Sequence, residues 1–455
     1  MRNREALDAV IKAYDVRGVV GEDIDEAFVR DVGAAFASLL REEEETTVAI
    51  GHDMRPSSPQ LADAFAEGVT SQGLDVIQLG LCATDELYFA AGTLNCAGAM
   101  FTASHNPAQY NGIKLCRKGA TPVGEATGLA TIKDKMVEGV ALDDVTPGTI
   151  SHRDILGDYA NFLNELVDLK ESRPLVVAVD SANGMGGHTV PAVFEKLPFD
   201  VRPLFFELDG TFPNHEANPL DPKNLVDLQK FVVEQGADIG LAFDGDADRC
   251  FVVDEKGEPV SPSAICALIA ERYLEKFPGE TIIHNLITSK TVPEIVVEHG
   301  GKPVRTRVGH SFIKAQMAEH SAVFGGEHSE HYYFQEFWNA DSGMLAALHV
   351  LAALGQSDAA LSELMSQYSR YFSSGEINST VSDQAASQQA IVEQLAEDIE
   401  SVDHLDGVTV QLKDTKAWFN VRASNTEPLL RLNVEAETKD EVAAIVERVL
   451  GIIRA

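Results

Sequence analysis

The chain has 455 residues, 45% of them hydrophobic, and its 71 Asp and Glu against 36 Lys and Arg give a formal net charge of −35. This length predicts several domain cores. The acidic balance argues against a nucleic-acid surface, because a phosphate backbone requires a basic stripe. A small phosphorylated ligand is compatible with it, since a few arginines inside a cleft can dominate the local potential.

Neither a membrane segment nor a disulfide framework is indicated. The apolar stretch 344–355 is shorter than the roughly 20 residues of a membrane span and contains His349. The N-terminal residues are charged and lack the apolar region of a signal peptide, so we expect a cytoplasmic protein that does not contact membranes. The five cysteines are odd in number and lack C-x-x-C spacing, which predicts reduced thiols and no structural zinc.

Short apolar strands alternate with helical patterns from about residue 46 to about residue 350, which is typical of α/β domains with largely parallel sheets. Turn-forming or polar stretches at 143–154, 254–259 and 369–383 divide the chain. In the first domain, 1–150, we expect strands at 47–53, 74–80 and 96–103 and a helix beginning at Ser58-Pro59.

The second and third domains, 151–254 and 255–368, continue this alternation. The second begins with a strand in the run 174–187, continues with a strand at 201–208 and a helix from Asn224, and ends with a strand, a loop and a strand over 237–255. The third has predicted helices at 262–276 and 344–354 and predicted strands at 281–286, 303–308 and 322–329.

The last domain, 369–455, has a different pattern. A long helix is predicted at 384–402, then strands at 407–412, 417–424 and 428–437, then a helix from Lys439. This order indicates an α+β domain. The expected fold is therefore four domains, three related α/β domains with mixed, mostly parallel sheets and a C-terminal α+β domain, around a central cleft.

Three aspartates occupy alternate positions in DGDADR, residues 244–249: Asp244, Asp246 and Asp248. Converging carboxylates repel one another unless a divalent cation lies among them, and hard oxygen ligands suit Mg²⁺. The stretch predicts a magnesium site, with a solvated acidic turn as the alternative. An EF-hand is excluded because Arg249 occupies the position that requires glycine and the flanks are predicted strands.

Residues 101–107, FTASHNP, place Ser104 just after a predicted strand. The chain has no G-x-S-x-G elbow that would make this serine a hydrolase nucleophile. Three carboxylate side chains leave room on Mg²⁺ for a phosphate oxygen. If Ser104 carries a phosphoryl group, its oxygen can complete the metal site, so we interpret Ser104 as a phosphate carrier and a metal ligand.

Five motifs occur in order along the chain: TASHNP, NGIK, DGDADR, GEHS and RASNTEP. In this order and at these separations they resemble the α-D-phosphohexomutase family. KAYDVRG near the start and PNHEANPLDPKNL at 213–225 are most similar to its bacterial phosphomannomutase/phosphoglucomutase branch, and the likeness covers essentially the whole chain. The resemblance implies the phosphoserine at Ser104 and the three aspartates as Mg²⁺ ligands.

The resemblance also implies how the reacting groups are assisted. Arg249 and the metal would neutralise charge on the transferring phosphoryl group. The candidates for the general acid and base at the sugar hydroxyl are His105, Lys114 and His310. A loop-shaping hydrogen bond is the alternative for His105, and an ion pair with Asp248 is the alternative for Lys114.

Residues from three of the domains are implied to bind the substrate. A carboxylate such as Glu327 can accept protons from two adjacent sugar hydroxyls, and the loop at 422–426 would hold the non-reacting phosphate, although a plain β-turn is the alternative for it. Glu330 and Glu427 stand where small or neutral residues are common in the family. The implied substrate-binding residues are Tyr14, Arg17, Glu327, Ser329, His331, Arg422, Ser424, Asn425 and Thr426.

The expected function is that of a phosphohexomutase interconverting hexose 6-phosphate and hexose 1-phosphate, with mannose and glucose as sugars. The cofactors implied are Mg²⁺ and hexose 1,6-bisphosphate, which is both intermediate and activator. The alternatives are a phosphoglucosamine mutase, a metal-dependent sugar phosphatase and a non-catalytic sugar-phosphate binder. The expected partners are small-molecule hexose phosphates, and the expected assembly is a monomer or homodimer.

Overall fold

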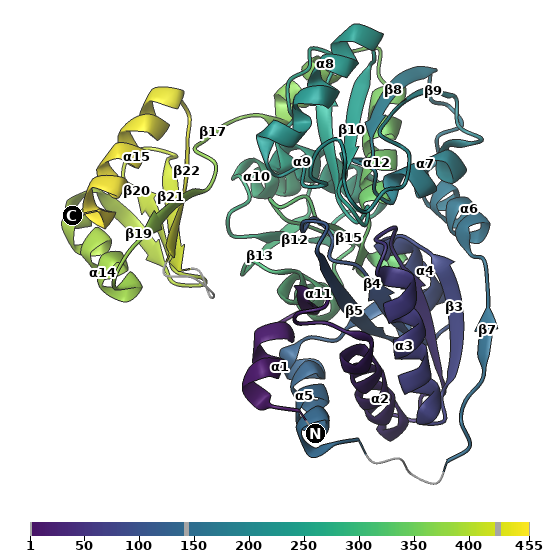
Figure 1. Ribbon diagram of the computed structural model, residues 1–455. Helices are drawn as coiled ribbons and strands as arrows, with labels where there is room; N and C mark the ends of the chain where they lie inside the picture. Colours follow the sequence, from purple (N-terminus) through teal and green to yellow (C-terminus); the bar gives the residue numbers. More distant parts are fainter. Residues whose placement is uncertain (1, 141–144, 424–428, 455) are drawn as a thin grey trace. The chain divides into compact units, whose positions relative to one another are not determined.

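The structure is a computed structural model that describes residues 2–140, 145–423 and 429–454 (Figure 1). These residues form two compact units. The first unit contains the chain up to Val260 together with Ser329–Leu364, and the second contains Ser261–His328 together with the chain from Met365 onward.

The N-terminal part of the first unit is a seven-stranded mixed sheet. Its strands are β1 (Val16–Val19), β2 (Thr47–His52), β3 (Asp75–Leu81), β4 (Ala97–Phe101), β5 (Tyr110–Arg117), β6 (Thr121–Pro122) and β7 (Ile150–His152). The order is β1-β5-β4-β2-β3-β7, with β6 on β5. β2 is parallel to β3 and β4, whereas β5 is antiparallel to β1 and β4. Every residue of β4 is buried, as expected of a strand covered on both faces.

Five helices within residues 2–140 accompany this sheet. They are α1 (Arg4–Val10), α2 (Glu26–Glu42), α3 (Ser58–Ser71), α4 (Thr84–Thr93) and α5 (Leu129–Glu138), with 3₁₀ turns at Lys118–Ala120 and Glu125–Thr127. α2 begins where the Asp25 carboxylate accepts from the Phe28 N–H at 2.6 Å, a helix cap. The backbones of α2 and α3 approach closely at Gly68. A Cβ at this position would lie 2.1 Å from the Arg30 carbonyl oxygen, so only glycine fits there.

A second sheet in the first unit has the order β11-β10-β8-β9. Its elements are β8 (Leu175–Asp180), β9 (Phe199–Leu204), β10 (Ile239–Phe243), β11 (Cys250–Asp254), α6 (Leu156–Leu166), α7 (Gly186–Phe194), a 3₁₀ turn at Pro222–Leu225 and α8 (Val226–Gln235). β8 is parallel to β9 and β10, and β10 forms an antiparallel hairpin with β11. The hairpin connection is residues 244–249, so the aspartate motif lies between two fully buried strands.

The remainder of the first unit contains β15 (Tyr332–Phe334), a 3₁₀ turn (Gln335–Phe337), β16 (Ala340–Asp341), α12 (Gly343–Gly355) and α13 (Leu361–Met365). β15 and β16 are antiparallel. Ser342 caps α12 by accepting the Leu345 N–H at 3.0 Å. Its hydroxyl also donates to Asp85 Oδ2 at 2.6 Å, and the Tyr159 hydroxyl donates to the same oxygen at 2.7 Å. This buried carboxyl therefore ties α4, α6 and the start of α12 together.

The second unit begins with three parallel strands in the order β13-β12-β14. These are β12 (Thr281–Asn285), β13 (Lys302–Thr306) and β14 (Phe324–Gly326), accompanied by α9 (Pro262–Lys276), α10 (Thr291–Glu298), α11 (His310–His320) and a 3₁₀ turn at Ser366–Tyr368. α9 has the bounds that the sequence predicts.

The C-terminal part is an antiparallel sheet in the order β17-β22-β21-β20-β19, with β18 on β22. Its elements are β17 (Phe372–Ser373), β18 (Ile377–Thr380), α14 (Gln384–Gln394), a 3₁₀ turn (Ala396–Asp398), β19 (Ile399–Asp403), β20 (Val408–Leu412), β21 (Trp418–Ala423), β22 (Leu429–Ala436) and α15 (Lys439–Ile453). A separate hydrophobic core is formed by the sheet and its helices. α15 starts with a reciprocal capping pair between Thr438 and Glu441.

The prediction of one long helix at 384–402 is wrong. The helix ends at Gln394, and Ile399–Asp403 is an edge strand paired with β20. Ile399 and Val402 pack against the core of this domain. Burial of these β-branched side chains and the ladder hydrogen bonds outweigh the weak helical preference of the surrounding polar residues.

The predicted class, α/β with mixed sheets followed by an α+β domain, is confirmed. None of the helices in the described part of the chain combines the length and the apolar character needed to span a membrane. All five cysteines are buried, and none forms a disulfide.

Candidate active site

The loop that carries Ser104 follows β4 and is held by a buried arginine. The side chain of Arg55 is fully buried, and its Nε donates to the Asp53 carboxylate at 3.2 Å. Its two terminal nitrogens donate to backbone carbonyl oxygens of the loop, at Ser104 (3.0 Å), Asn106 (2.7 Å), Pro107 (2.8 Å) and Tyr110 (3.0 Å). These hydrogen bonds satisfy the loop carbonyls from inside the protein and tie the loop to Arg55.

Ser104 itself has an unusual backbone conformation. Its φ is +48°, in the left-handed region that side chains other than glycine rarely adopt. The residue is 5% exposed, and its hydroxyl donates to Asp244 Oδ2 at 2.9 Å. Such strain persists where surrounding contacts enforce it and is common at active sites.

The aspartate loop approaches Ser104 closely because residue 245 is glycine. A Cβ on Gly245 would lie 2.4 Å from the Ser104 carbonyl oxygen, a distance that no side chain tolerates. The motif DGDADR thus has two roles. Its aspartates place carboxylates at alternate positions, and Gly245, which has no side chain, lets the backbone contact the serine loop.

The three aspartates converge as predicted. One oxygen from each of Asp244, Asp246 and Asp248 lies within 4.8 Å of the others, and all three residues are buried. Lys114 Nζ on β5 donates to Asp246 Oδ2 at 2.7 Å and to Asp248 Oδ2 at 2.6 Å. The Thr84 hydroxyl, in the first turn of α4, donates to Asp246 Oδ2 at 2.6 Å.

The electrostatics of this cluster fit a divalent cation. Burial, partly offset by Arg249, raises the pKa of Asp244 to about 7. For Asp246, burial is outweighed by the charge and hydrogen bond of Lys114, and its pKa is lowered. Oδ1 of Asp246 and Oδ1 of Asp248 are buried without a hydrogen-bond partner among the described residues. Oxygen atoms of this kind are the ligands that Mg²⁺ takes in proteins.

Arg249 links the aspartates to His105. Its Nε and Nη2 donate to Asp244 Oδ2 at 3.0 and 2.9 Å, and Nη2 donates to His105 Nδ1 at 2.7 Å. Burial and the charges of Arg249 and Arg17 lower the pKa of His105 far below its usual value. The imidazole is therefore neutral and accepts at Nδ1, while Lys114, whose pKa is raised by Asp246 and Asp248 against the effect of burial, is protonated.

The other residues predicted in the first unit lie around this centre. Arg17 on β1 donates to Asn106 Oδ1, in the serine loop, at 2.6 Å. Tyr14 and Ser329 are half-buried. His331 Nδ1 lies 2.9 Å from Asp341 Oδ2, and one atom each of Asp248, His331 and Asp341 lie within 4.8 Å of one another. The structure thus brings together Arg17, Ser104, His105, Lys114, Asp244, Asp246, Asp248, Arg249 and His331.

The second unit holds the remaining predicted residues. Glu327 is buried and accepts the Gly309 N–H at 3.0 Å and the Asn285 side-chain amide at 3.3 Å. Arg422 Nη2 donates to Glu376 Oε2 at 2.8 Å, and Arg431, its neighbour across the β21–β22 pair, contacts the other Glu376 oxygen at 3.4 Å. The predicted residues Ser424, Asn425 and Thr426 and the side chain of His310 lie outside the described residues.

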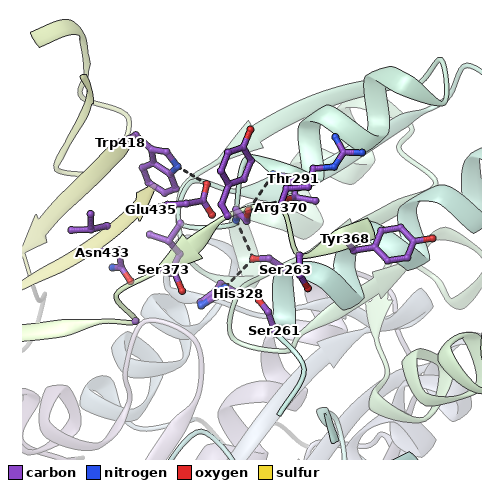
Figure 2. A pocket seen from close by; sticks show the side chains of 16 residues that line it. Ser261, Ser263, Thr291, His328, Tyr368, Arg370, Ser373, Trp418, Asn433 and Glu435 are labelled. Atoms are coloured by element: carbon purple, nitrogen blue, oxygen red, sulfur yellow. Dashed lines mark hydrogen bonds between the residues drawn. The ribbon is translucent and has the colours of Figure 1, made fainter. Parts of the chain in front are cut away.

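A polar pocket in the second unit is lined by none of the predicted residues (Figure 2). Its walls are fixed by internal hydrogen bonds: Ser263 Oγ lies 3.0 Å from His328 Nδ1, and Glu435 Oε1 accepts from Trp418 Nε1 at 2.8 Å. The side chains of these four residues are therefore held by hydrogen bonds within this unit.

Several residues of the site were not predicted from the sequence. Arg55, Thr84 and Asp341 orient the predicted residues from neighbouring elements. The one available signal was the apolar run VAIGHD, which ends at Asp53, because strand ends in α/β sheets are where functional loops begin.

Comparison with known proteins identifies one family along most of the chain. The description "Phosphoglucomutase/phosphomannomutase, alpha/beta/alpha domain I" matches residues 8–140, those of domains II and III match 157–257 and 261–371, and that of the C-terminal domain matches 376–452. The chain belongs to the phosphoglucomutase/phosphomannomutase family. The protein is accordingly a phosphohexomutase with the four domains of that family.

Individual phosphohexomutases support this assignment. The chain is 39% identical over 440 residues to "Phosphohexose mutases" of Xanthomonas campestris pv. campestris, covering 96% of both chains. It is 38% identical over 435 residues to a phosphomannomutase of Escherichia coli, covering 93% of this chain and 94% of the relative. A solved structure of a phosphoglucomutase/phosphomannomutase family protein from Burkholderia thailandensis superposes with a TM-score of 0.88 at 30% identity, covering 100% of this chain and 98% of the other.

Proposed function

We propose that this phosphohexomutase moves a phosphoryl group between C1 and C6 of a hexose phosphate by way of phosphoserine at Ser104 and a hexose 1,6-bisphosphate. The observation that carries the proposal is the buried contact of the Ser104 hydroxyl with Asp244, at 2.9 Å, beneath Arg249. Carboxylates around a serine do little to make it an acyl nucleophile. They suit a serine that carries a phosphate, because a cation held by the same carboxylates, together with Arg249, can neutralise the phosphate charge.

In the proposed reaction, a free sugar hydroxyl attacks the phosphorus of phospho-Ser104. The bond from phosphorus to Ser104 Oγ breaks, the hydroxyl proton leaves, and Oγ takes up a proton, so that the products are a bisphosphate and free Ser104. The bisphosphate then turns around and returns its other phosphate to Ser104. His105, Lys114 and His310 are the candidates for accepting and donating these protons. In the resting protein His105 is neutral and Lys114 is protonated.

Asp244, Asp246 and Asp248, with Ser104, would hold Mg²⁺. When bound, the cation supplies charge neutralisation at the transferring phosphoryl group. Arg249 contributes a fixed positive charge beside it, held by two hydrogen bonds to Asp244.

For substrate binding we propose one loop from each of four domains, 1–150, 151–254, 255–368 and 369–455. Glu327 and Ser329 would contact sugar hydroxyls that mannose and glucose share, with Tyr14, Arg17 and His331 around the sugar. Arg422, together with Ser424, Asn425 and Thr426, would hold the non-reacting phosphate; the pairing of Arg422 and Arg431 on one carboxylate, Glu376, supports this, because a phosphate can replace that carboxylate.

Intact-mass spectrometry of the purified protein tests the proposal directly. Phosphorylated Ser104 adds about 80 Da to the chain, and Ser104→Ala should lack that mass and nearly all turnover while still binding hexose phosphate. A phosphatase would release inorganic phosphate from hexose phosphates, and a non-catalytic binder would carry no phosphate. A Ser104→Ala variant with substantial mutase activity would overturn the carrier role.

Sugar preference is settled by a side-by-side assay. We expect turnover of mannose 1-phosphate and glucose 1-phosphate, each with its own 1,6-bisphosphate. Preferential turnover of glucosamine 1-phosphate would support the phosphoglucosamine mutase alternative.

A further inference from the structure

His331 and Asp341 face each other across the β15–β16 pair. His331 immediately precedes β15 and Asp341 ends β16, and Tyr333 pairs with Asp341 in the strand register. The His331 Nδ1 to Asp341 Oδ2 distance is 2.9 Å, with side-chain exposures of 22% for His331 and 5% for Asp341. The imidazole thus keeps an accessible edge, while the carboxylate that holds it is covered.

The carboxylate of Asp341 stands on a rigid turn. The next residue, Ser342, donates its N–H to the Tyr332 carbonyl at 3.1 Å and caps α12. The Ser342 hydroxyl is anchored on buried Asp85 at 2.6 Å. The backbone hydrogen bond from Ser342 to Tyr332 joins the residue after Asp341 to β15, and it is this bond that holds the carboxylate beside His331.

The hydrogen bond fixes which ring nitrogen carries the proton. An ionised carboxylate can only accept, so the contact requires the proton on Nδ1, and a neutral imidazole then has its lone pair on Nε2. The charged groups facing the ring are Asp341, Asp248 and Arg249; burial alone would lower the pKa of His331, but the hydrogen bond to Asp341 and the charges of Asp248 and Asp341 outweigh it, and the pKa is raised.

We propose that Asp341 is a positioning residue that fixes the orientation and the Nδ1–H tautomer of His331, so that Nε2 is the nitrogen presented to the hexose phosphate. The proposal rests on the proposed function of His331 as a substrate-binding residue. Asp341 does not contact the substrate in this arrangement; it acts through the imidazole alone.

The test uses histidine-selective ¹⁵N labelling of the full-length protein. The ring nitrogens of His331, assigned by their loss in His331→Gln, should show Nδ1 protonated and Nε2 unprotonated in the neutral form. In Asp341→Asn the amide can donate to Nδ1, so the tautomer should change to Nε2–H, and kcat for glucose 1-phosphate should fall by roughly tenfold to a hundredfold, with KM changed less than kcat.

Ser342→Ala is the matched control. It removes the helix cap and the hydrogen bond to Asp85, one residue from Asp341, but leaves the His331–Asp341 contact. Its midpoint of urea unfolding should fall while the His331 tautomer and kcat stay near those of the unaltered protein. An Asp341→Asn variant that behaves like Ser342→Ala would overturn the proposal, as would an Nε2–H tautomer in the unaltered protein.

Metal stoichiometry tests the competing role. Asp248, His331 and Asp341 also lie close enough to hold a cation, so two equivalents of bound Mn²⁺, one of them lost in Asp341→Asn, would make Asp341 a ligand and overturn the positioning role. The ring-nitrogen signals are measured in the resting protein and do not depend on turnover. If the unaltered protein had no mutase activity, the proposed function would be refuted, while the tautomer of His331 would still be tested.

Discussion

The serine loop and the β21–β22 pair, to which we assign the reacting and the non-reacting phosphate in the proposed function, are built differently. At Ser104, buried Arg55 donates to four backbone carbonyls and Asp53. At the β21–β22 pair, Arg422 and Arg431 share one partly exposed carboxylate, Glu376. If the proposed function holds, the residue that reacts is fixed by buried hydrogen bonds, whereas the arginines that bind a phosphate share a carboxylate that the phosphate can replace.

The largest effect that this comparison predicts is at Arg55. Arg55→Ala leaves the buried Asp53 carboxylate without its charge partner and should lower the free energy of unfolding by about 3–5 kcal/mol, measured by urea denaturation, together with a loss of turnover. As a control, Arg30→Ala breaks an exposed ion pair with Glu67 and should cost less than about 1 kcal/mol. Equal costs for the two variants would contradict a special role of Arg55.

The next effect concerns the contact between the two loops of the site. In Gly245→Ala the new Cβ would meet the Ser104 carbonyl at 2.4 Å, so the loops must separate, and kcat should fall on the order of a hundredfold. Gly157→Ala is the control, because nothing lies within 4 Å of a Cβ there and Gly157 is in α6. Full activity of Gly245→Ala in a steady-state assay would show that the close approach is dispensable.

A pH effect is expected at Asp85. Burial raises the pKa of Asp85 to about 8, even though the hydroxyls of Ser342 and Tyr159 favour the ionised form. Since the folded-state pKa is above the ordinary value, the stabilisation is complete below about pH 4 and is lost as pH rises through about 8, by at most about 1.4 kcal/mol per pH unit.

Asp85→Asn has no proton to lose in this range, so its stability in urea unfolding should change less between pH 5 and pH 8. Its amide oxygen still accepts both hydroxyls, so the hydrogen bonds are kept. Asp85→Ala, which loses both hydrogen bonds, should be less stable at every pH. Parallel profiles for Asp85→Asn and the unaltered protein would refute the raised pKa.

The smallest effect is expected at the β21–β22 pair. Arg422→Ala removes one charged hydrogen-bond donor, and KM for hexose phosphate should rise by about tenfold, with little change in kcat or in the phosphate content of Ser104. Arg448→Ala, which breaks an exposed ion pair with Asp398 in the same domain, should leave KM unchanged. A fall in kcat comparable to that of Gly245→Ala would remove the distinction between the two regions.

The features that could be predicted from the sequence were those formed by residues close together in the chain. The spacing of Asp244, Asp246 and Asp248 predicts a cation site, and α9 was predicted with its observed bounds. The strand at 399–403 was missed because its partner, β20, lies beyond a turn and its own residues are mostly polar.

The supporting residues could not be predicted for a different reason. Arg55 binds carbonyl oxygens, which every residue possesses, so nothing in the sequence of the serine loop marks its partner. Thr84 and Asp341 meet Asp246 and His331 only after separate elements have packed together. Information of this kind belongs to tertiary structure, and a single sequence does not display it.

The five covered thiols have a practical consequence. Cys82, Cys96 and Cys116 lie in the first sheet and α4 region, Cys250 in β11 and Cys266 in α9, and burial raises the pKa of Cys82 and Cys250 well above the usual value. An alkylating dye should consequently label each site only when its own segment opens. Peptide mapping of the labelled chain would then report when each of the segments that carry these cysteines opens, without any engineered probe; the C-terminal domain has no cysteine and would not be monitored.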